Sequence, residues 1–337
     1  MIAIWFAAGN SGDFGRGASM VEDFGRRIEP YRRELLAHCY RILGSVHDAE
    51  DLVQETCLRA WRARDRYDPA RGSLRTWLYR IATHACLTAL ESRGRRPLPS
   101  GMVADSRPLD PLVHGGEVTW LQPMPDALLH LGDPAGAAVD RGSLRLAFVA
   151  ALQHLSARQR AALILREVLA FSAAETADIL GTSVASVNSS LQRARARLNQ
   201  AGVLEDQVGE PSQAQQRACV DRYMTAFANA DVEGLKRLLT DDVLMEMPPM
   251  LNWFVGRDNY GRFMDWVFDK AGTTWHLVPV AANGQPGFAA YNLGADGVFE
   301  LHTLQVFTVT ASGIGRNTVF RDAEVFASFD LAPRFEV

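Results

Sequence analysis

Residues 161–198 constrain the fold more than any other stretch, because they predict two helices joined by a very short turn. Ser172 followed by Glu175 has the spacing of a capping box, which begins a helix, and Gly181 supplies a helix stop. Only Thr182–Ser183 separate that glycine from a second helix. The apolar positions of the second helix recur at helical spacing: Val187, Leu191, Ala194 and Leu198. Two helices on so short a turn form a helix-turn-helix.

The opposite side of the second helix is polar and basic. It carries Ser186, Ser189, Ser190, Arg193 and Arg197, with Arg195 in the same helix. No Asp or Glu occurs between residues 183 and 202. Hydroxyl and guanidinium groups without acids match phosphates and base edges, so this helix is predicted to bind DNA. The alternative is an ordinary helical hairpin with a solvated basic face.

Charge divides the chain into blocks. The net charge is +4 over residues 22–96, −5 over 97–140, +5 over 141–203 and −5 over 213–337, against −4 for the whole chain. Two basic blocks around an acidic segment, followed by an acidic domain, are not typical of a single globular enzyme. They favour a nucleic-acid-binding protein that carries its own acidic counterpart.

Length and cysteine usage set further bounds. A chain of 337 residues should hold two or three domains. The four cysteines are far apart, so neither a zinc site nor a disulfide framework is indicated, and this usage suits a reducing cytoplasm. No apolar run is long enough to span a bilayer, and the apolar opening lacks the basic start of a signal peptide. We expect residues 1–19 to be a disordered extension or a misassigned start.

The first basic block begins with two predicted helices. The first covers residues 22–43 and ends at Gly44. Asp48 is expected to cap the second, which has Val53 and Ala60 on its buried side. Five polar groups crowd its first turns: Asp48, Glu50, Asp51, Gln54 and Glu55. Carboxylates there favour the helix dipole, but stability needs only one or two of them, so the patch also suits a basic protein surface.

A loop containing Tyr67 and Gly72 leads to a third helix, over residues 73–96. Six of its residues can face a core: Leu74, Trp77, Leu78, Ile81, Ala82 and Ala85. Five others are expected on or near the exposed side: Arg75, Tyr79, Arg80, Thr83 and Thr88. Aromatic rings among cations suit single-stranded nucleic acid, whose bases stack while its backbone is neutralised. The alternative is that Trp77 and Tyr79 are core and boundary residues, and for Trp77 that interpretation is the stronger.

The chain between the two basic blocks is predicted to be an irregular linker, residues 97–140, because it is rich in Pro, Gly and Asp. A helix over residues 143–154 follows. Ser156 and Gln159 then form a second capping box, ahead of the helix that leads into the helix-turn-helix.

In this order the motifs closely resemble extracytoplasmic-function sigma factors, group IV of the sigma-70 family, which direct bacterial RNA polymerase to promoters. The resemblance covers residues 22–203 and rests on DAEDLVQET, RGSLRTWLYRIATHACLTALESRGRR and LSARQRAALILREVLAFSAAETADILGTSVASVNSSLQRARARL. It implies core RNA polymerase and promoter DNA as partners, and no cofactor. We expect an extension (1–19), sigma domain 2 (20–96), an acidic linker (97–140), sigma domain 4 (141–203), a short linker (204–212) and a tail domain (213–337).

The resemblance also implies roles for three surfaces. The polymerase clamp would be bound by Asp48, Glu50, Asp51, Gln54 and Glu55. The minus-10 element and its melted strand would be held by Tyr67, Ser73, Arg75, Tyr79 and Arg80. The minus-35 element would be bound by Ser186, Asn188, Ser189, Gln192, Arg193, Arg195 and Arg197. The linker would enter the nucleic-acid channel of the polymerase, where its acidic character would keep it off promoter DNA.

The tail is predicted to be an α+β domain, with helices first and a mostly antiparallel sheet after them. Val220, Tyr223, Met224 and Phe227 mark one helix, and Asp231 opens a second that runs through Leu239. A third helix spans residues 260–268. Strands are expected in DDVLMEMPP, TWHLVPVAA, GFAAYNL, FELHTLQVFTV and NTVFRDAEVF.

The pattern AFANADVEGLKRLLTDDVLMEMPPMLNWFVGRDNYGRFM resembles the SnoaL-like branch of the nuclear-transport-factor-two-like superfamily. That fold is a cone whose curved sheet wraps a pocket. The fold class is therefore multidomain: two all-α sigma-factor modules followed by an α+β cone-shaped domain. Pocket candidates are Met247, Trp253, Phe254, Trp266, His302 and Asp322, with His276 as a further titratable residue.

Two interpretations of the tail remain open, and the non-catalytic one is preferred because no tail residue matches a catalytic position securely. It controls the sigma modules in cis, with or without a small-molecule ligand, or it is a working SnoaL-like cyclase or isomerase fused to a DNA-binding half. A polar dyad in the pocket would favour the enzyme, and an apolar or filled cone packed on the basic modules would favour control. The sequence leaves open whether a separate anti-sigma factor binds the chain.

Overall fold

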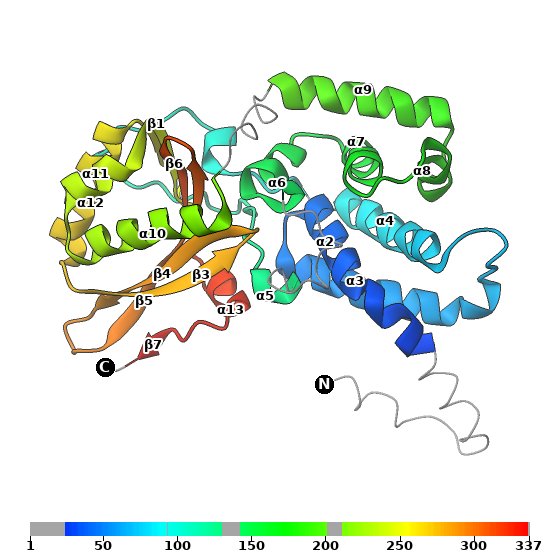
Figure 1. Cartoon of the computed structure of the whole chain (residues 1–337), viewed down its shortest axis with the longest axis horizontal. Helices are drawn as coiled ribbons and strands as arrows, with labels where there is room; N and C mark the ends of the chain where they lie inside the picture. Colours follow the sequence, from blue (N-terminus) through cyan, green and yellow to red (C-terminus); the bar gives the residue numbers. More distant parts are fainter. Residues whose placement is uncertain (1–23, 93, 130–141, 201–210, 336–337) are drawn as a thin grey trace, which may run out of the picture.

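The computed structural model describes residues 24–92, 94–129, 142–200 and 211–335. The predicted N-terminal extension lies outside the described residues, as do most of the second linker and the end of the first. Two helical modules lie on one side of the molecule and the α+β tail domain on the other (Figure 1). No helix of the described ranges combines the length and apolar character needed to cross a bilayer.

The first module is built on three helices, α2 (Arg32–Leu43), α3 (Val46–Arg62) and α4 (Leu74–Ser92). The first predicted helix is interrupted by the 3-10 turn η1 (Glu29–Tyr31), which contains Pro30, and it ends at Gly44 in a left-handed conformation (φ 69°). The prediction that Asp48 caps α3 is wrong. Ser45 is the cap, because its hydroxyl accepts a hydrogen bond from the Asp48 N–H group.

Helix α4 is packed on more sides than its sequence suggested. It contacts α2 and α3 of its own module and also α7 and α8 of the second module. We expected Tyr79 and Thr83 near the exposed side, but both side chains are buried. The Tyr79 hydroxyl donates to Glu34, and Thr83 bonds the His38 ring at 2.9 Å. Contact with the second module leaves α4 only a narrow solvent face.

The second module comprises η5 (Gly142–Leu144), α6 (Leu146–Leu152), α7 (Ala157–Leu163), the π-helical turn η6 (Ile164–Val168), α8 (Ala173–Leu180) and α9 (Val184–Gln200). Both predicted capping boxes are present, at Ser156 and at Ser172. Gly181 ends α8 with φ 59°, as the helix-turn-helix requires. Helix α9 lies along the outer edge of the molecule, with α7 and α8 between it and α4 (Figure 1).

The tail domain begins with α10 (Gln213–Ala228) and α11 (Val232–Leu238), the latter capped by Asp231 as predicted. Its other elements are β1 (Leu239–Glu246), β2 (Trp253–Val255), α12 (Arg257–Ala271), β3 (Trp275–Ala282), β4 (Gln285–Leu293), β5 (Phe299–Thr310), β6 (Gly313–Phe320), α13 (Ala323–Ser328) and β7 (Arg334–Phe335). The sheet order is β2-β1-β6-β5-β4-β3, with β7 paired to β5, and only β1 and β6 run parallel. The last predicted strand is half wrong, because the chain leaves the sheet after Phe320 and Asp322 caps α13.

The linker is irregular, as predicted, apart from η3 (Pro99–Gly101) and α5 (Asp126–Leu129). It is nevertheless packed: Leu98, Leu121, Met124 and Leu129 are buried. Much of it is bound to the tail domain by backbone hydrogen bonds, among them Ser106 N–H to the Trp253 carbonyl (2.8 Å). The linker therefore connects three parts of the protein, where the sequence indicated two.

Candidate nucleic-acid interface and tail cavity

The polar face of α9 is exposed, and its apolar stripe is buried against the rest of the second module. Val187, Leu191, Ala194 and Leu198 are all at most 6% exposed. Asn188, Gln192 and Arg193 lie on the exposed side. The Ser183 hydroxyl accepts from the Ser186 N–H group (3.2 Å), which fixes the start of the helix. These contacts orient the basic face outward.

The three arginines of α9 differ in their contacts. Arg193 donates to the Ser189 hydroxyl one turn earlier (2.6 Å). Arg195 forms an exposed ion pair with Glu167 (2.5 Å). Arg197 donates to the His154 carbonyl (2.9 Å). Exposed pairs of this kind contribute little to stability, so Arg193 and Arg195 can exchange these partners for phosphate at low cost.

The expected strand-holding surface of α4 faces the second module. The Arg75 guanidinium bonds Glu34 (2.9 Å) and lies over the rings of Tyr79 (4.9 Å) and Phe171 (4.8 Å). Arg80 pairs with Asp178 of α8 at 3.3 Å. Phe171 and Asp178 both belong to the second module, so each arginine already has a partner there.

The loop before α4 is ordered by its own side chains. The Tyr67 and Trp77 rings lie 5.2 Å apart, and the Tyr67 hydroxyl donates to the Gly72 carbonyl (3.3 Å). Ser73 accepts from the Thr76 N–H group (3.0 Å). Ser73 therefore has a local capping role in addition to any contact with DNA.

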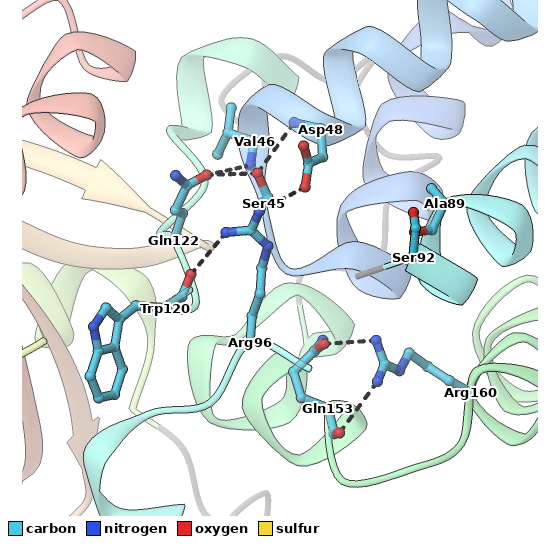
Figure 2. A network of polar contacts seen from close by, with 10 residues as sticks. All are labelled: Ser45, Val46, Asp48, Ala89, Ser92, Arg96, Trp120, Gln122, Gln153 and Arg160. Carbon is cyan, nitrogen blue, oxygen red and sulfur yellow. Dashed lines mark hydrogen bonds and ion pairs between the residues drawn. The ribbon is translucent and has the colours of Figure 1, made fainter. Parts of the chain in front are cut away.

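One member of the acidic set on α3 is engaged within the molecule. Figure 2 shows Arg96 between Asp48 (2.8 Å) and the Trp120 carbonyl (3.2 Å), and both charged side chains are largely buried. Gln122 of the linker accepts from the Ser45 hydroxyl at the same place (2.9 Å). The first turn of α3 is therefore held by the linker.

The remaining members stay on the surface of α3. Glu55 pairs with Arg59 one turn later (2.7 Å), while Asp51 and Gln54 are exposed and Glu50 is half-buried. Leu58 is 46% exposed and follows Asp51 and Gln54 at helical spacing, so it extends the acidic patch with an apolar group. Val184, at the start of α9, is likewise 43% exposed. Sequence reasoning missed both residues, because an isolated leucine or valine is normally assigned to a core.

The tail encloses a cavity of about 280 Å³. Three of the expected residues line it: Met247, Trp266 and His302. The other three do not. The Trp253 indole donates to the Val103 carbonyl in the linker, Phe254 is buried against Phe263, and Asp322 caps α13. His276 is exposed on β3 against the Phe335 ring, outside the cavity.

The cavity offers little acid–base chemistry. Among the described residues that line it there is no Asp or Glu. Burial, with the nearby Arg321 charge, lowers the pKa of His302 to about 4, so its ring is neutral at pH 7. Burial also raises the pKa of Tyr260, behind the wall, to about 12. His302 and Tyr260 are therefore uncharged near neutrality, and the charged groups that line the cavity are the exposed Lys270 and Arg321.

A β-turn of the tail joins the two modules and the linker. The Asn283 side chain, in the turn between β3 and β4, accepts from Met124 N–H (2.8 Å) and donates to the Tyr40 hydroxyl (2.8 Å) and the Leu144 carbonyl (2.6 Å). It is fully buried. Gln285, two residues on, accepts from Leu146 N–H (2.9 Å). We call these contacts the Asn283 junction.

A second set of hydrogen bonds connects the two helical modules directly. Arg160 of α7 is buried, and its guanidinium donates to the Gln153 side chain (2.7 Å; Figure 2). It also donates to the Ile42 carbonyl of α2. Both terminal nitrogens of this buried guanidinium have acceptors, since its second nitrogen donates to the Gln153 and Leu155 carbonyls (both 3.3 Å), and a buried charge depends on such partners. Separating the modules would remove one of its acceptors.

Comparison with known proteins agrees with this architecture. Three family models match the chain: sigma-70 region 2 over residues 27–96, sigma-70 region 4 over 145–198 and a SnoaL-like domain over 220–322. The ECF RNA polymerase sigma factor SigG of Mycobacterium tuberculosis is 45% identical over 314 residues, which cover 92% of this chain and 84% of that protein. SigJ of the same organism is 30% identical over 314 residues, 90% of each chain. The crystal structure of SigJ has a similar fold, with a TM-score of 0.63, 24% identity and coverage of 94% of this chain and 100% of SigJ.

Two helical modules with a recognition helix, followed by a cone-shaped domain, define a multidomain DNA-binding protein of transcription. The chain belongs to the extracytoplasmic-function RNA polymerase sigma factors and carries a SnoaL-like domain at its C-terminal end. The predicted family and fold class are thus confirmed. Its function is that of a sigma factor in transcription initiation, and the relatives above are sigma factors rather than enzymes.

Proposed function

We propose that this sigma factor binds core RNA polymerase and promoter DNA in the cytoplasm, and that its linker and tail hold regions 2 and 4 in a closed state that must open first. In this proposal region 2 covers residues 20–96, region 4 covers 141–203 and the regulatory tail covers 213–337. The observation that carries it is that surfaces expected to meet the partners are already engaged within the chain.

Three engaged residues support the closed state. Arg75 stacks on Phe171, and Arg80 pairs with Asp178, so the minus-10 surface of region 2 contacts region 4. Asp48 of the polymerase surface is paired with Arg96, which also donates to the Trp120 carbonyl of the linker. Regions 2 and 4 read promoter elements that are separated along the duplex. A state that packs α4 against α8 therefore has to open before both regions can contact DNA.

The proposed contact residues fall into three groups. The polymerase surface comprises Asp48, Glu50, Asp51, Gln54 and Glu55, to which we add Leu58. The minus-10 surface comprises Tyr67, Ser73, Arg75 and Arg80, with Tyr79 supporting Arg75 from within the core. The minus-35 surface comprises Ser186, Asn188, Ser189, Gln192, Arg193, Arg195 and Arg197, to which we add Val184. An exposed valine at the start of a recognition helix suits contact with a thymine methyl group.

We infer that the tail regulates rather than catalyses. Among the described cavity residues there is no carboxylate, and the neutral His302 ring, whose pKa is about 4, is only a weak base far from the pKa that suits general base catalysis near pH 7. The cone also packs on the helical modules through the Asn283 junction. Both features favour control in cis over the alternative of a fused cyclase or isomerase.

Run-off transcription with core RNA polymerase tests the proposal. The full chain, an Asn283→Gly variant and a chain ending at Leu204 are compared on a promoter library. We expect promoter-specific transcripts, and more of them at limiting sigma concentration when the junction is weakened. Asn259→Ala is the matched control, since Asn259 lies on α12 and bonds only the nearby Val255 carbonyl. Transcription that falls on weakening the junction would make the tail an activator, and no transcripts from any form would favour the enzyme.

A further inference from the structure

The tail cavity has an apolar, adaptable lining. Four methionines and several aromatic rings line it, among them Met245, Met247, Met250, Met264, Phe263 and Trp266. Methionine side chains adjust their shape to irregular apolar groups. The cavity has a volume of about 280 Å³. At about 30 Å³ for each water-sized group, it has room for a ligand of on the order of ten non-hydrogen atoms.

The polar groups of the wall are of two kinds. His302, Thr303 and Gln305 lie along β5, and Gln305 accepts from the buried Asn317 (2.9 Å). The other two are the exposed cations Lys270 and Arg321, and Arg321 is near enough to His302 to lower the pKa of its ring.

These two cations have little competition for an anion. Lys270 pairs only with the adjacent, well-exposed Asp269 (3.1 Å), and Arg321 takes part in none of the ion pairs found in the described ranges. With no acid in the described lining, the electrostatic potential near these two cations favours a negatively charged group.

We propose that the cavity binds a small apolar monocarboxylate, with its hydrocarbon part among the methionines and its carboxylate at Arg321 and Lys270. A guanidinium is suited to a carboxylate because it donates two parallel hydrogen bonds. A dicarboxylate would bury its second carboxylate among the methionines, where an unpaired charge is costly. Binding itself does not depend on the proposed regulatory function, and it can be measured without polymerase.

The linker forms part of the same wall, which gives the ligand a route to the sigma modules. Leu112 lines the cavity. The next residue, Val113, donates to the Asn252 side chain and accepts from Leu251 N–H, both at 2.7 Å. A ligand that contacts Leu112 stabilises this docked linker, and by linkage the docked linker strengthens ligand binding. Occupancy of the cavity therefore favours the closed state.

Calorimetric titration of the full chain with octanoate and octanamide tests the ligand class, because the two probes have the same size and differ in charge. We expect octanoate to bind about tenfold more tightly, since charge-assisted hydrogen bonds exceed neutral ones in strength. Arg321→Gln should reduce this difference, and Arg321→Gln combined with Lys270→Gln should remove it, while the octanamide affinity stays unchanged. Arg237→Gln, which removes an exposed tail charge that pairs with Asp231, is the matched control and should keep the difference.

Two further measurements locate the site. Ala271→Trp, on the last turn of α12, should fill the cavity and abolish binding of both probes, with circular dichroism to check folding. Octanoate should slow amide hydrogen exchange at Val113 and Leu251 in the unmodified chain. Equal affinity for the two probes, no binding by either, or octanoate binding without protection of Val113 would overturn the proposal. None of these results depends on transcription, so failure here is distinct from failure of the proposed sigma regulation.

Discussion

Replacing Asn283 by glycine should loosen the closed state without straining the backbone. Asn283 has φ 59°, a conformation that glycine adopts freely. The change removes three side-chain hydrogen bonds, to Met124 N–H, the Tyr40 hydroxyl and the Leu144 carbonyl. At about 1 kcal/mol net for each bond, the closed state loses about 3 kcal/mol, which is roughly a hundredfold in the opening equilibrium.

Hydrogen exchange measured by mass spectrometry distinguishes opening from a local effect. Met124 N–H loses its own acceptor and must exchange faster in any case. Leu146 and Gly284 donate instead to Gln285 and Asp126, so their amides report on the whole junction. We expect exchange at both to rise by up to about a hundredfold, in proportion to the opening equilibrium. Faster exchange confined to Met124 would refute the view that Asn283 holds the closed state together.

Three further predictions concern single side chains. Arg193→Ala should weaken promoter binding by the holoenzyme and reduce the slope of log affinity against log salt by about one, measured by anisotropy; an unchanged slope would remove Arg193 from the phosphate contacts. Asp178→Asn frees Arg80 from an exposed pair, so the melting temperature should hardly change while transcription rises, and lower transcription would contradict the masking of Arg80. Burial, with the charges of Arg41 and Arg75, lowers the pKa of His38 to about 3. The folded chain therefore keeps a neutral ring while the unfolded chain binds a proton below about pH 6.5. Stability is full above pH 6.5 and falls by about 1.4 kcal/mol per unit as the pH drops toward 3. His38→Gln should show a smaller shift of the urea midpoint between pH 7 and pH 5, and an equal shift would exclude this origin.

Contacts between residues close in sequence could be predicted from the sequence alone. The capping boxes at Ser156 and Ser172, the stop at Gly181, the cap at Asp231 and the buried stripe of α9 all involve neighbours within about four residues or one helical period. Such contacts depend on local helix geometry, which is the same wherever the segment lies in the fold. The order of helices and most strands followed from the same local rules.

Tertiary structure decided whether each polar side chain is buried and which group it bonds. Tyr79 was expected at the surface, but α4 packs on two modules and buries it. Asp48 was assigned to a helix cap and a polymerase contact, and it pairs with Arg96, distant in the chain. Nothing in the sequence indicated that Asn283 contacts other domains, because an asparagine in a turn gives the same local pattern whether its side chain is solvated or buried against another domain.

The residues that line the cavity could likewise be predicted only in part from the sequence. The sequence identified Met247, Trp266 and His302 by residue type, while Trp253, Phe254 and Asp322 had types equally suited to a pocket and point elsewhere. Leu112, from a linker more than a hundred residues before the sheet, could not have been foreseen as part of the wall. Periodicity determines which face of an element is apolar, but the partner of that face depends on how distant segments pack, which no local pattern encodes.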